Sequence, residues 1–347
     1  MLFNSVSLVT NIAKGYSLEQ ALQIVSECGF GRVEIASIGG MCEHVTPGDI
    51  TPEFIETLVD MLKSYNLSSY AFSGHVDLTE DSGVEAFLLK MDLAAGIGCK
   101  VINTNAGPAG RLAEFRRNLP IIIDRAERLG LTVCLESHGD IIGSAKEASR
   151  LFKEINHPLI RMNYDTGNTY YYAKRNIPIE DDILYGLEYL AYIHIKDVYI
   201  GDDRRGNDRC MDKRDSDDRC RDNRCSDNRD SDDRCSDKRC SDNSDSDDRC
   251  SDNRCSDNRE RDDRCRDDWD SGDIARYVPI GMGGINFPKV FASLAQLGRP
   301  IDCGLEIPVF VAGTPDALSS SAAPISVEAI RSAVGQSMEY LRDLAVV

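Results

Sequence analysis

Short runs rich in β-branched residues alternate with longer amphipathic runs along most of this chain. Such alternation is typical of βα units and of a parallel sheet. Eight units joined by right-handed crossovers close most economically into a barrel, so the sequence predicts an α/β protein with a (β/α)8 TIM barrel. The predicted strands are LFNSVSL (2–8), RVEIAS (32–37), SSYAFSG (68–74), KVINTN (100–105), LTVCLES (131–137), IRMNYD (160–165), AYIHIKD (191–197) and DCGLEIP (302–308).

One segment interrupts this alternation. Residues 201–273 contain 26 Asp or Glu, 18 Lys or Arg and eight Cys, with few apolar side chains. The cysteines recur on a five-residue grid, and a period of five builds neither an apolar helical stripe nor a strand face. We therefore predict a low-complexity insertion after the seventh strand that is disordered in isolation. The predicted domains are barrel strands one to seven in residues 1–200, the insertion in residues 201–273, and strand eight with the last helix in residues 274–347.

The insertion could have a function, or it could be a tolerated tandem expansion with no chemistry of its own. The closest cysteine spacing is C-x4-C, whereas thiolate zinc sites prefer C-x2-C. Calcium loops need a glycine turn at a fixed place among their ligands, which the repeat lacks. A redox-sensitive or lid-like loop is a further alternative. The tandem expansion is the favoured interpretation.

Charge and hydropathy narrow the range of partners. The net charge is −18, of which residues 201–273 carry −8 (18 minus 26) and the rest −10. Neither part concentrates positive charge as a phosphate-binding surface does, which argues against nucleic acid. No apolar run approaches the roughly 18 to 20 residues of a membrane span, and the N-terminus lacks signal-peptide features. We expect a cytoplasmic protein with no membrane partner and with reduced core thiols outside the insertion, and a homo-oligomer is an open alternative.

Polar side chains stand at or just beyond the C-terminal ends of seven predicted strands. In chain order they are Glu34, His75, Asn105, Glu136, Asp165, His194 and Glu306. In a (β/α)8 barrel all these ends open onto one face, where active sites are built. The last four come from strands five to eight, which are neighbours around a barrel. Three carboxylates and one imidazole suit Mn²⁺, Mg²⁺ or Co²⁺ better than a closed structural zinc site, so we predict a divalent-metal site there, with Zn²⁺ as a further possibility.

Sequence motifs surround these strand ends. They are LESH (135–138), NYDTGN (163–168), HIKD (194–197), PIGMGGINF (279–287) and GLEIP (304–308), with CGFGRVEI (28–35) and SGHVDL (73–78) nearer the N-terminus. In combination and in this order the motifs resemble the xylose isomerase-like TIM barrel superfamily, the sugar phosphate isomerase/epimerase group. The resemblance covers essentially the whole chain except residues 201–273 and does not select one substrate. We interpret GMGGIN (281–286) as a tight turn that feeds a helix beginning near Asn286.

The resemblance implies a small-molecule carbohydrate substrate and a divalent metal as cofactor. It implies Glu136, Asp165, His194 and Glu306 as the metal ligands, with the two glutamates also acting as the acid/base pair. One glutamate would remove a proton next to a carbonyl and the other would return it. An enediolate stabilised by the cation would thereby become an epimer or an aldose/ketose isomer. The residues implied to contact the substrate are His75, Asn105, His138, Asn168, Lys196 and Glu34. Glu34 could instead support a metal ligand from behind, and a capping role is an equal alternative for it.

Two other functions fit the same residues. The enediolate could instead expel a β-hydroxyl, which would make the protein a dehydratase of the inosose or dehydroshikimate type. A degenerate, sugar-binding barrel is the non-enzymatic alternative. Asn168 stands where some epimerases of the family have a histidine, which argues against transferring ketose 3-epimerase specificity to this chain. The trinuclear zinc endonucleases of the superfamily need more histidines than the five present here, so DNA repair is disfavoured.

Overall fold

The computed structural model of the chain describes residues 2–172, 176–202, 273–308 and 324–347. Within the segments Met1–Asp202 and Asp273–Val347, these residues form one compact unit. The disordered insertion was predicted at residues 201–273, and of these residues 203–272 lie outside the described residues. No described helix has both the length and the apolar character needed to cross a membrane.

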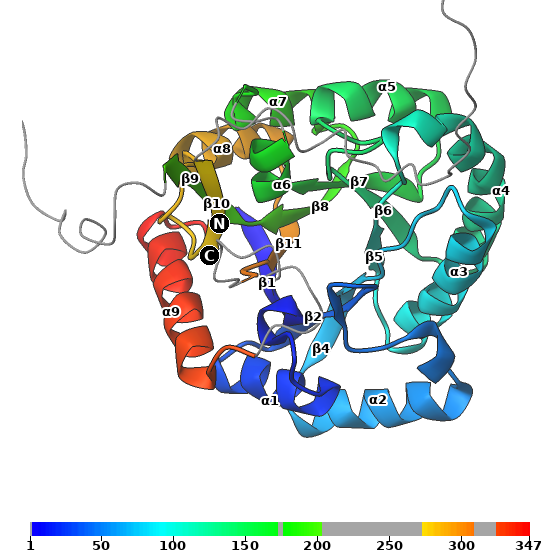
Figure 1. Cartoon of the computed structure of the whole chain (residues 1–347), viewed down its shortest axis with the longest axis horizontal. Helices are drawn as coiled ribbons and strands as arrows, with labels where there is room; N and C mark the ends of the chain where they lie inside the picture. The colour runs from blue at the N-terminus through cyan, green and yellow to red at the C-terminus, as the bar shows by residue number, and fades with distance from the viewer. Residues whose placement is uncertain (1, 173–175, 203–272, 309–323) are drawn as a thin grey trace, which may run out of the picture. The chain divides into compact units, whose positions relative to one another are not determined.

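Eight parallel strands form a closed barrel (Figure 1). Their order is β1, β11, β8, β7, β6, β5, β4 and β2, and pairing of β1 with β2 closes the ring. Each strand coincides with one of the eight predicted from the sequence, so the predicted (β/α)8 barrel is confirmed. The barrel strands are β1 (Phe3–Val9), β2 (Arg32–Ile38), β4 (Ser68–Ser73), β5 (Val101–Thr104), β6 (Thr132–Glu136), β7 (Ile160–Asp165), β8 (Leu190–Ile195) and β11 (Ile301–Leu305).

Helices surround the barrel strands (Figure 1). Ser17, Thr51, Ser144 and Ser326 each accept a backbone N–H from the first turn of the helix that follows. Such caps satisfy N–H groups that have no partner within the helix and so define where it begins. The helices are α1 (Leu18–Glu27), α2 (Pro52–Ser64), α3 (Asp81–Gly96), α4 (Leu112–Leu129), α5 (Ala145–Ile155), α6 (Thr166–Tyr172), α7 (Ile179–Gly186), α8 (Phe287–Leu294) and α9 (Val327–Asp343), with 3-10 turns η1 (Thr10–Ala13), η2 (Pro47–Asp49), η3 (Ala109–Arg111) and η4 (Ala295–Leu297).

The strands separate apolar from polar side chains by the pleat of the sheet. Val33 and Ile35 of β2 belong to the main apolar cluster, which also contains helix residues such as Leu22 and Phe87. Successive side chains of a strand point to opposite faces, so Glu34, between Val33 and Ile35, points the other way, into the barrel. Of the five cysteines described, all are free thiols and four are buried, as expected for reduced core residues.

Two antiparallel pairings were not predicted. β9 (Asp197–Asp202) follows β8 after one residue and pairs with β10 (Asp273–Val278) across the insertion. β3 (Cys42–Glu43) pairs with the end of β2. The β9–β10 hairpin therefore brings the two ends of the insertion side by side, and it includes Gly201 and Asp273, which the sequence analysis had assigned to the insertion.

Candidate metal centre

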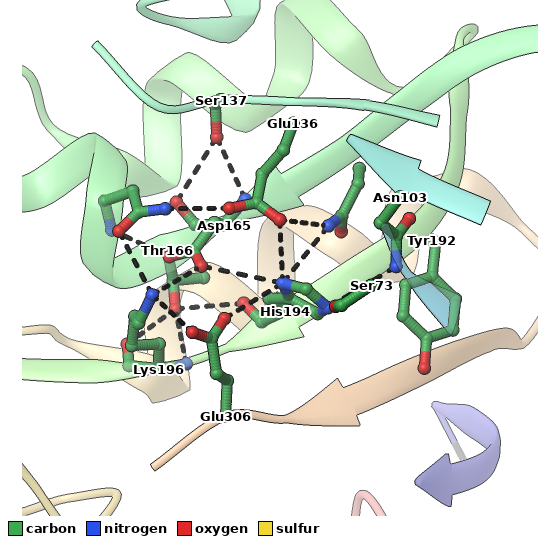
Figure 2. A network of polar contacts seen from close by, with 12 residues as sticks. Ser73, Asn103, Glu136, Ser137, Asp165, Thr166, Tyr192, His194, Lys196 and Glu306 are labelled. Carbon is green, nitrogen blue, oxygen red and sulfur yellow. Dashed lines mark hydrogen bonds and ion pairs between the residues drawn. The ribbon is translucent and has the colours of Figure 1, made fainter. Parts of the chain in front are cut away.

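A histidine and three carboxylates meet at the C-terminal ends of four adjacent strands. Glu136 ends β6, Asp165 ends β7, and His194 is the next-to-last residue of β8. Glu306 follows β11 directly, and its backbone N–H donates to the carbonyl of Ile195. The four side chains are buried, and one possible ligand atom of each lies within 4.8 Å of the others (Figure 2).

The imidazole of His194 presents one nitrogen to these carboxylates. Its Nδ1 lies 3.0 Å from Oε2 of Glu136 and 3.0 Å from Oε2 of Glu306. Its other nitrogen, Nε2, lies 3.0 Å from Oε1 of Glu34. With a metal bound, Nε2–H would donate to Glu34 and Nδ1 would offer its lone pair to the ion. A metal-binding histidine is oriented in this way by a carboxylate on its second nitrogen.

Glu34 is itself held from three other strands, β4, β5 and β8. Its Oε1 accepts hydrogen bonds from Ser73 Oγ at 2.6 Å and from Asn103 Nδ2 at 2.8 Å, and its Oε2 accepts one from the Tyr192 hydroxyl at 2.9 Å. Burial works against its charge, yet contact with His194 lowers the pKa of Glu34 below its ordinary value. Glu34 therefore holds the imidazole of His194 in one orientation.

Three side-chain donors hold Glu136 in one orientation. Its Oε2 accepts hydrogen bonds from Asn163 Nδ2 at 2.8 Å and from His75 Nε2 at 3.1 Å, and its Oε1 accepts one from Asn168 Nδ2 at 2.9 Å. Burial opposes ionisation of Glu136, but His75 and His194 keep its pKa well below the usual range. The carboxylate is thus ionised and positioned before any ligand binds.

Lys196 supplies positive charge to the other two carboxylates. Its Nζ lies 3.1 Å from Oδ2 of Asp165 and 2.8 Å from Oε1 of Glu306 (Figure 2). Burial works against its charge, but the two carboxylates raise the pKa of Lys196 well above its ordinary value. Burial raises the pKa of Asp165 to about 6, against the effect of Lys196. The Glu306 carboxylate also accepts a 2.8 Å hydrogen bond from Asn11 Nδ2.

This donor set fits one divalent cation. The separation of the donor atoms, at most 4.8 Å, is close to the distance between ligands on opposite sides of a single ion. Three carboxylates and one imidazole nitrogen form an oxygen-rich set that suits Mg²⁺, Mn²⁺ or Co²⁺. Buried carboxylates at this range repel one another, so a cation between them is electrostatically favoured. Glu136, Asp165, His194 and Glu306 could therefore hold the metal.

The other predicted site residues lie around this centre. His75 contacts Glu136, and its Nδ1 is buried without a partner among the described residues. The Oδ1 of Asn105 is likewise buried and unpaired in that part of the chain. The His138 ring packs 5.2 Å from the Tyr172 ring, and burial lowers the pKa of His138 to about 4.

Two asparagines of the centre were missed by the sequence analysis. Asn163 donates to Glu136 and also lies 3.2 Å from Nδ1 of His194. It lies two residues before Asp165 on β7, so the two-residue period of a strand would have placed both side chains on one face. Asn11 lies two residues beyond the end of β1, and the strand-end rule applied to that strand would have selected it.

Asp197 anchors the turn that was predicted at GMGGIN. Its carboxylate accepts hydrogen bonds from the backbone N–H groups of Gly281 at 2.9 Å and Gly283 at 2.8 Å. Gly281 has a φ of +87°, a conformation that favours glycine. The turn leads into α8, for which Asn286 is the N-cap residue, as the sequence analysis expected.

Comparisons with known proteins agree with this fold. A family model described as xylose isomerase-like TIM barrel matches residues 22–222. A xylose isomerase domain protein from Planctomyces limnophilus is 15% identical, with 99% of this chain and 98% of that chain covered and a TM-score of 0.62. D-psicose 3-epimerase, solved in the presence of D-fructose, is 11% identical, with 99% and 100% covered and a TM-score of 0.62. A probable 3-DHS dehydratase from Bacillus anthracis is 14% identical, with 95% and 97% covered and a TM-score of 0.56. A search of curated proteins finds no match.

Proposed function

Because the chain belongs to the xylose isomerase-like TIM barrel family, we propose that it is a divalent-metal-dependent epimerase or isomerase of a sugar or sugar phosphate. The observation that carries this proposal is that Glu136, at the end of β6, and Glu306, directly after β11, each place a carboxylate oxygen 3.0 Å from His194 Nδ1 (Figure 2). Two carboxylates on opposite sides of a substrate carbon are what proton removal from one face and return to the other requires.

In the proposed mechanism, a sugar binds with the carbon next to its carbonyl between the two glutamates. One glutamate removes the proton from that carbon and the other delivers a proton, to the opposite face in an epimerisation. A bound divalent ion would supply positive charge beside the oxygen on which negative charge develops. Asn163, Asn168 and Lys196 hold the two carboxylates in place, so little reorganisation is needed during the transfer.

We propose that the sugar hydroxyls meet His75, Asn105 and His138. His75 Nε2–H donates to Glu136, which leaves Nδ1 as an acceptor, and Asn105 Oδ1 is a second acceptor. Both atoms are buried and lack a partner among the described residues, and their residues follow adjacent strands, β4 and β5. Sugar hydroxyls are donors that would satisfy both. Glu34, Asn168 and Lys196 were also expected to contact the substrate. In this proposal they instead contact the candidate metal ligands: Glu34 contacts His194, Asn168 contacts Glu136, and Lys196 contacts Asp165 and Glu306.

A dehydratase is the second candidate. It is supported by the fold shared with the probable 3-DHS dehydratase. The same proton abstraction leads to loss of a β-hydroxyl if the substrate carries one in a position to leave. In that case Glu136 and Glu306 would remove the proton and protonate the leaving hydroxyl.

Solvent deuterium exchange tests the proposed function. Protein loaded with Mn²⁺ is incubated in deuterated water with D-fructose, D-psicose and a panel of other ketoses and their phosphates, and proton NMR follows the signal next to the carbonyl. We expect exchange with at least one sugar, together with appearance of its epimer or isomer. Glu136→Gln and Glu306→Gln should each slow it by about 10² to 10⁴, while Glu339→Gln, an exposed change on α9, should not.

Two results would contradict the proposal. One is the absence of exchange with every sugar although the metal is bound, and the other is unchanged exchange in both glutamine variants. A new ultraviolet absorption from 3-DHS, with no exchange into any ketose, would select the dehydratase instead.

A further inference from the structure

The ammonium of Lys196 has a full set of acceptors. Its Nζ lies 3.1 Å from Oδ2 of Asp165, 2.8 Å from Oε1 of Glu306 and 3.1 Å from Oδ1 of Asn168. An ammonium has three N–H donors, and these acceptors match them in number. A substrate atom that bonded to this ammonium would have to displace one of the three. Lys196 is therefore better placed to bind the carboxylates of the candidate metal ligands than to bind a sugar.

The two residues that follow Asp165, Thr166 and Gly167, lie against the backbone and the aliphatic stem of Lys196. Thr166 Oγ1 donates to the carbonyl of Lys196 at 2.7 Å and accepts its backbone N–H at 3.0 Å. A Cβ on Gly167 would come within 2.5 Å of Cγ of Lys196. Gly167 thus leaves the space through which the stem runs toward the carboxylates.

Tyr277 lies over the same ammonium. Its ring centroid is 5.2 Å from Nζ of Lys196, within the range in which an aromatic face attracts a cation. Tyr277 belongs to β10 and pairs with Val198 of β9, the strand that begins directly after Lys196. The hairpin at the base of the insertion therefore reaches the ion pairs of the candidate metal centre.

We propose that Tyr277 holds the ammonium of Lys196 in place, and that Lys196 is a fixed internal cation that compensates the charges of Asp165 and Glu306 while no metal is bound. This inference rests on the proposed function, because it assigns positioning residues to the same centre. Its basis is charge: the ammonium offsets the repulsion between buried carboxylates while no ion is bound. Lys196 therefore matters most to the metal-free protein, since a divalent ion takes over the same compensation.

Melting temperatures of Lys196 variants test this role without an assay of turnover. Full-length protein is freed of metal with a chelator and melted with and without Mn²⁺. Lys196→Met should lower the melting temperature of the metal-free protein by about 10 °C, and Mn²⁺ should raise it by more than in the wild type. Lys153→Met, an exposed change on α5, serves as the control. Should Lys196→Met not fold, Lys196→Gln removes the charge while keeping polar contacts.

A double-mutant cycle tests the part played by Tyr277. Tyr277→Phe keeps the ring and Tyr277→Leu removes it. In the Lys196 background, Tyr277→Leu should melt below Tyr277→Phe by about 2 to 4 °C. In the Lys196→Gln background this difference should vanish, because no cation remains for the ring to attract.

Either of two results would overturn the inference. One is a Lys196→Met protein whose metal-free melting temperature and response to Mn²⁺ equal those of the wild type. The other is a difference between Leu and Phe at position 277 that is the same in both backgrounds, which would mean that Tyr277 acts by packing alone. The proposed function is tested separately, by deuterium exchange with the wild-type protein. A negative result there would leave the two melting experiments unchanged.

Discussion

Glu34 and His194 are 160 residues apart in the chain and share a buried hydrogen bond of 3.0 Å. This bond determines which imidazole nitrogen faces Glu136 and Glu306. Glu34→Gln removes the charge that orients the imidazole, and we expect Mn²⁺ affinity to fall by roughly 10- to 100-fold. Isothermal titration of the metal-free protein measures this, with Glu339→Gln as the surface control. Equal affinity in wild type and Glu34→Gln would show that Glu34 does not set the orientation of His194.

Lys90 is a buried cation away from the metal ligands. Its Nζ, on α3, donates to the carbonyl of Ser37 at 2.7 Å and lies 3.5 Å from that of His75. Burial lowers the pKa of Lys90 from 10.5 to about 8. Between about pH 8 and 10.5 the unfolded chain keeps a proton that the folded chain has lost, so this residue makes the free energy of unfolding rise with pH.

Lys90→Met should remove that pH dependence. The free energy of unfolding of the wild type, relative to the variant, should increase by up to about 3 kcal/mol between pH 8 and 10.5. Urea denaturation of both proteins at several pH values measures the difference, in which titrations common to both cancel. Parallel curves for the two proteins would contradict a lowered pKa at Lys90.

Single residues of the centre were predictable where they lie at strand ends. Polar residues at the C-terminal ends of the predicted strands were taken as site candidates, and this rule selected Glu136, Asp165 and His194 because the topology of a barrel brings those strand ends together. It did not reveal that Glu34 would contact His194 in preference to solvent or substrate. That contact depends on which way each side chain points inside the barrel, and spacing in the sequence does not specify this across non-neighbouring strands.

At the level of elements, α5 and α7 are joined by one buried carboxylate. Asp182 of α7 accepts the backbone N–H groups of Ala145 at 2.8 Å and Lys146 at 3.1 Å, in the first turn of α5. It also accepts the hydroxyl of Tyr164 at 3.1 Å, from β7. Asp182→Ala leaves these donors without a partner, and we expect a loss of about 1 to 3 kcal/mol in the free energy of unfolding.

The adjacent exposed residue of α7 provides the control for this prediction. Asp181→Ala changes the same helix turn without removing a buried acceptor, so its effect should stay within about 0.5 kcal/mol. Urea denaturation of both variants compares them directly. Similar losses in the two would mean that the contact between α7 and α5 contributes little.

The β9–β10 hairpin is the element that the sequence did not reveal. Both strands border a segment of low-complexity composition, and DVYIGD (197–202) was read as the end of one barrel strand and the start of the insertion. Antiparallel pairing between residues so far apart in the chain has no local sequence signal. The eight barrel strands were predictable because each combines β-branched residues with a neighbouring helical pattern.

For the whole molecule, the contacts described above for the candidate metal centre are all made by residues outside the segment 203–272. Replacing these residues with a short turn between Asp202 and Asp273 should leave Mn²⁺ affinity unchanged and the melting temperature within about 3 °C, because loop length costs little free energy. Removing the hairpin as well, from 197 to 278, should weaken Mn²⁺ binding, since Asp197, which anchors the turn at Gly281 and Gly283, is then lost. Weaker binding after the shorter deletion alone would show that the insertion contributes to the centre.

The central claim is that four adjacent strand ends form one divalent-metal site. Elemental analysis of protein dialysed against Mn²⁺ and then against metal-free buffer tests it most directly. The proteins compared are the wild type, His194→Ala and His157→Ala, the last at a histidine that precedes the N-terminal end of β7 and contacts Glu127. The account predicts about one Mn per chain in the wild type and in His157→Ala, and a loss of most of it in His194→Ala. No bound metal in the wild type, or equal metal in all three proteins, would contradict it.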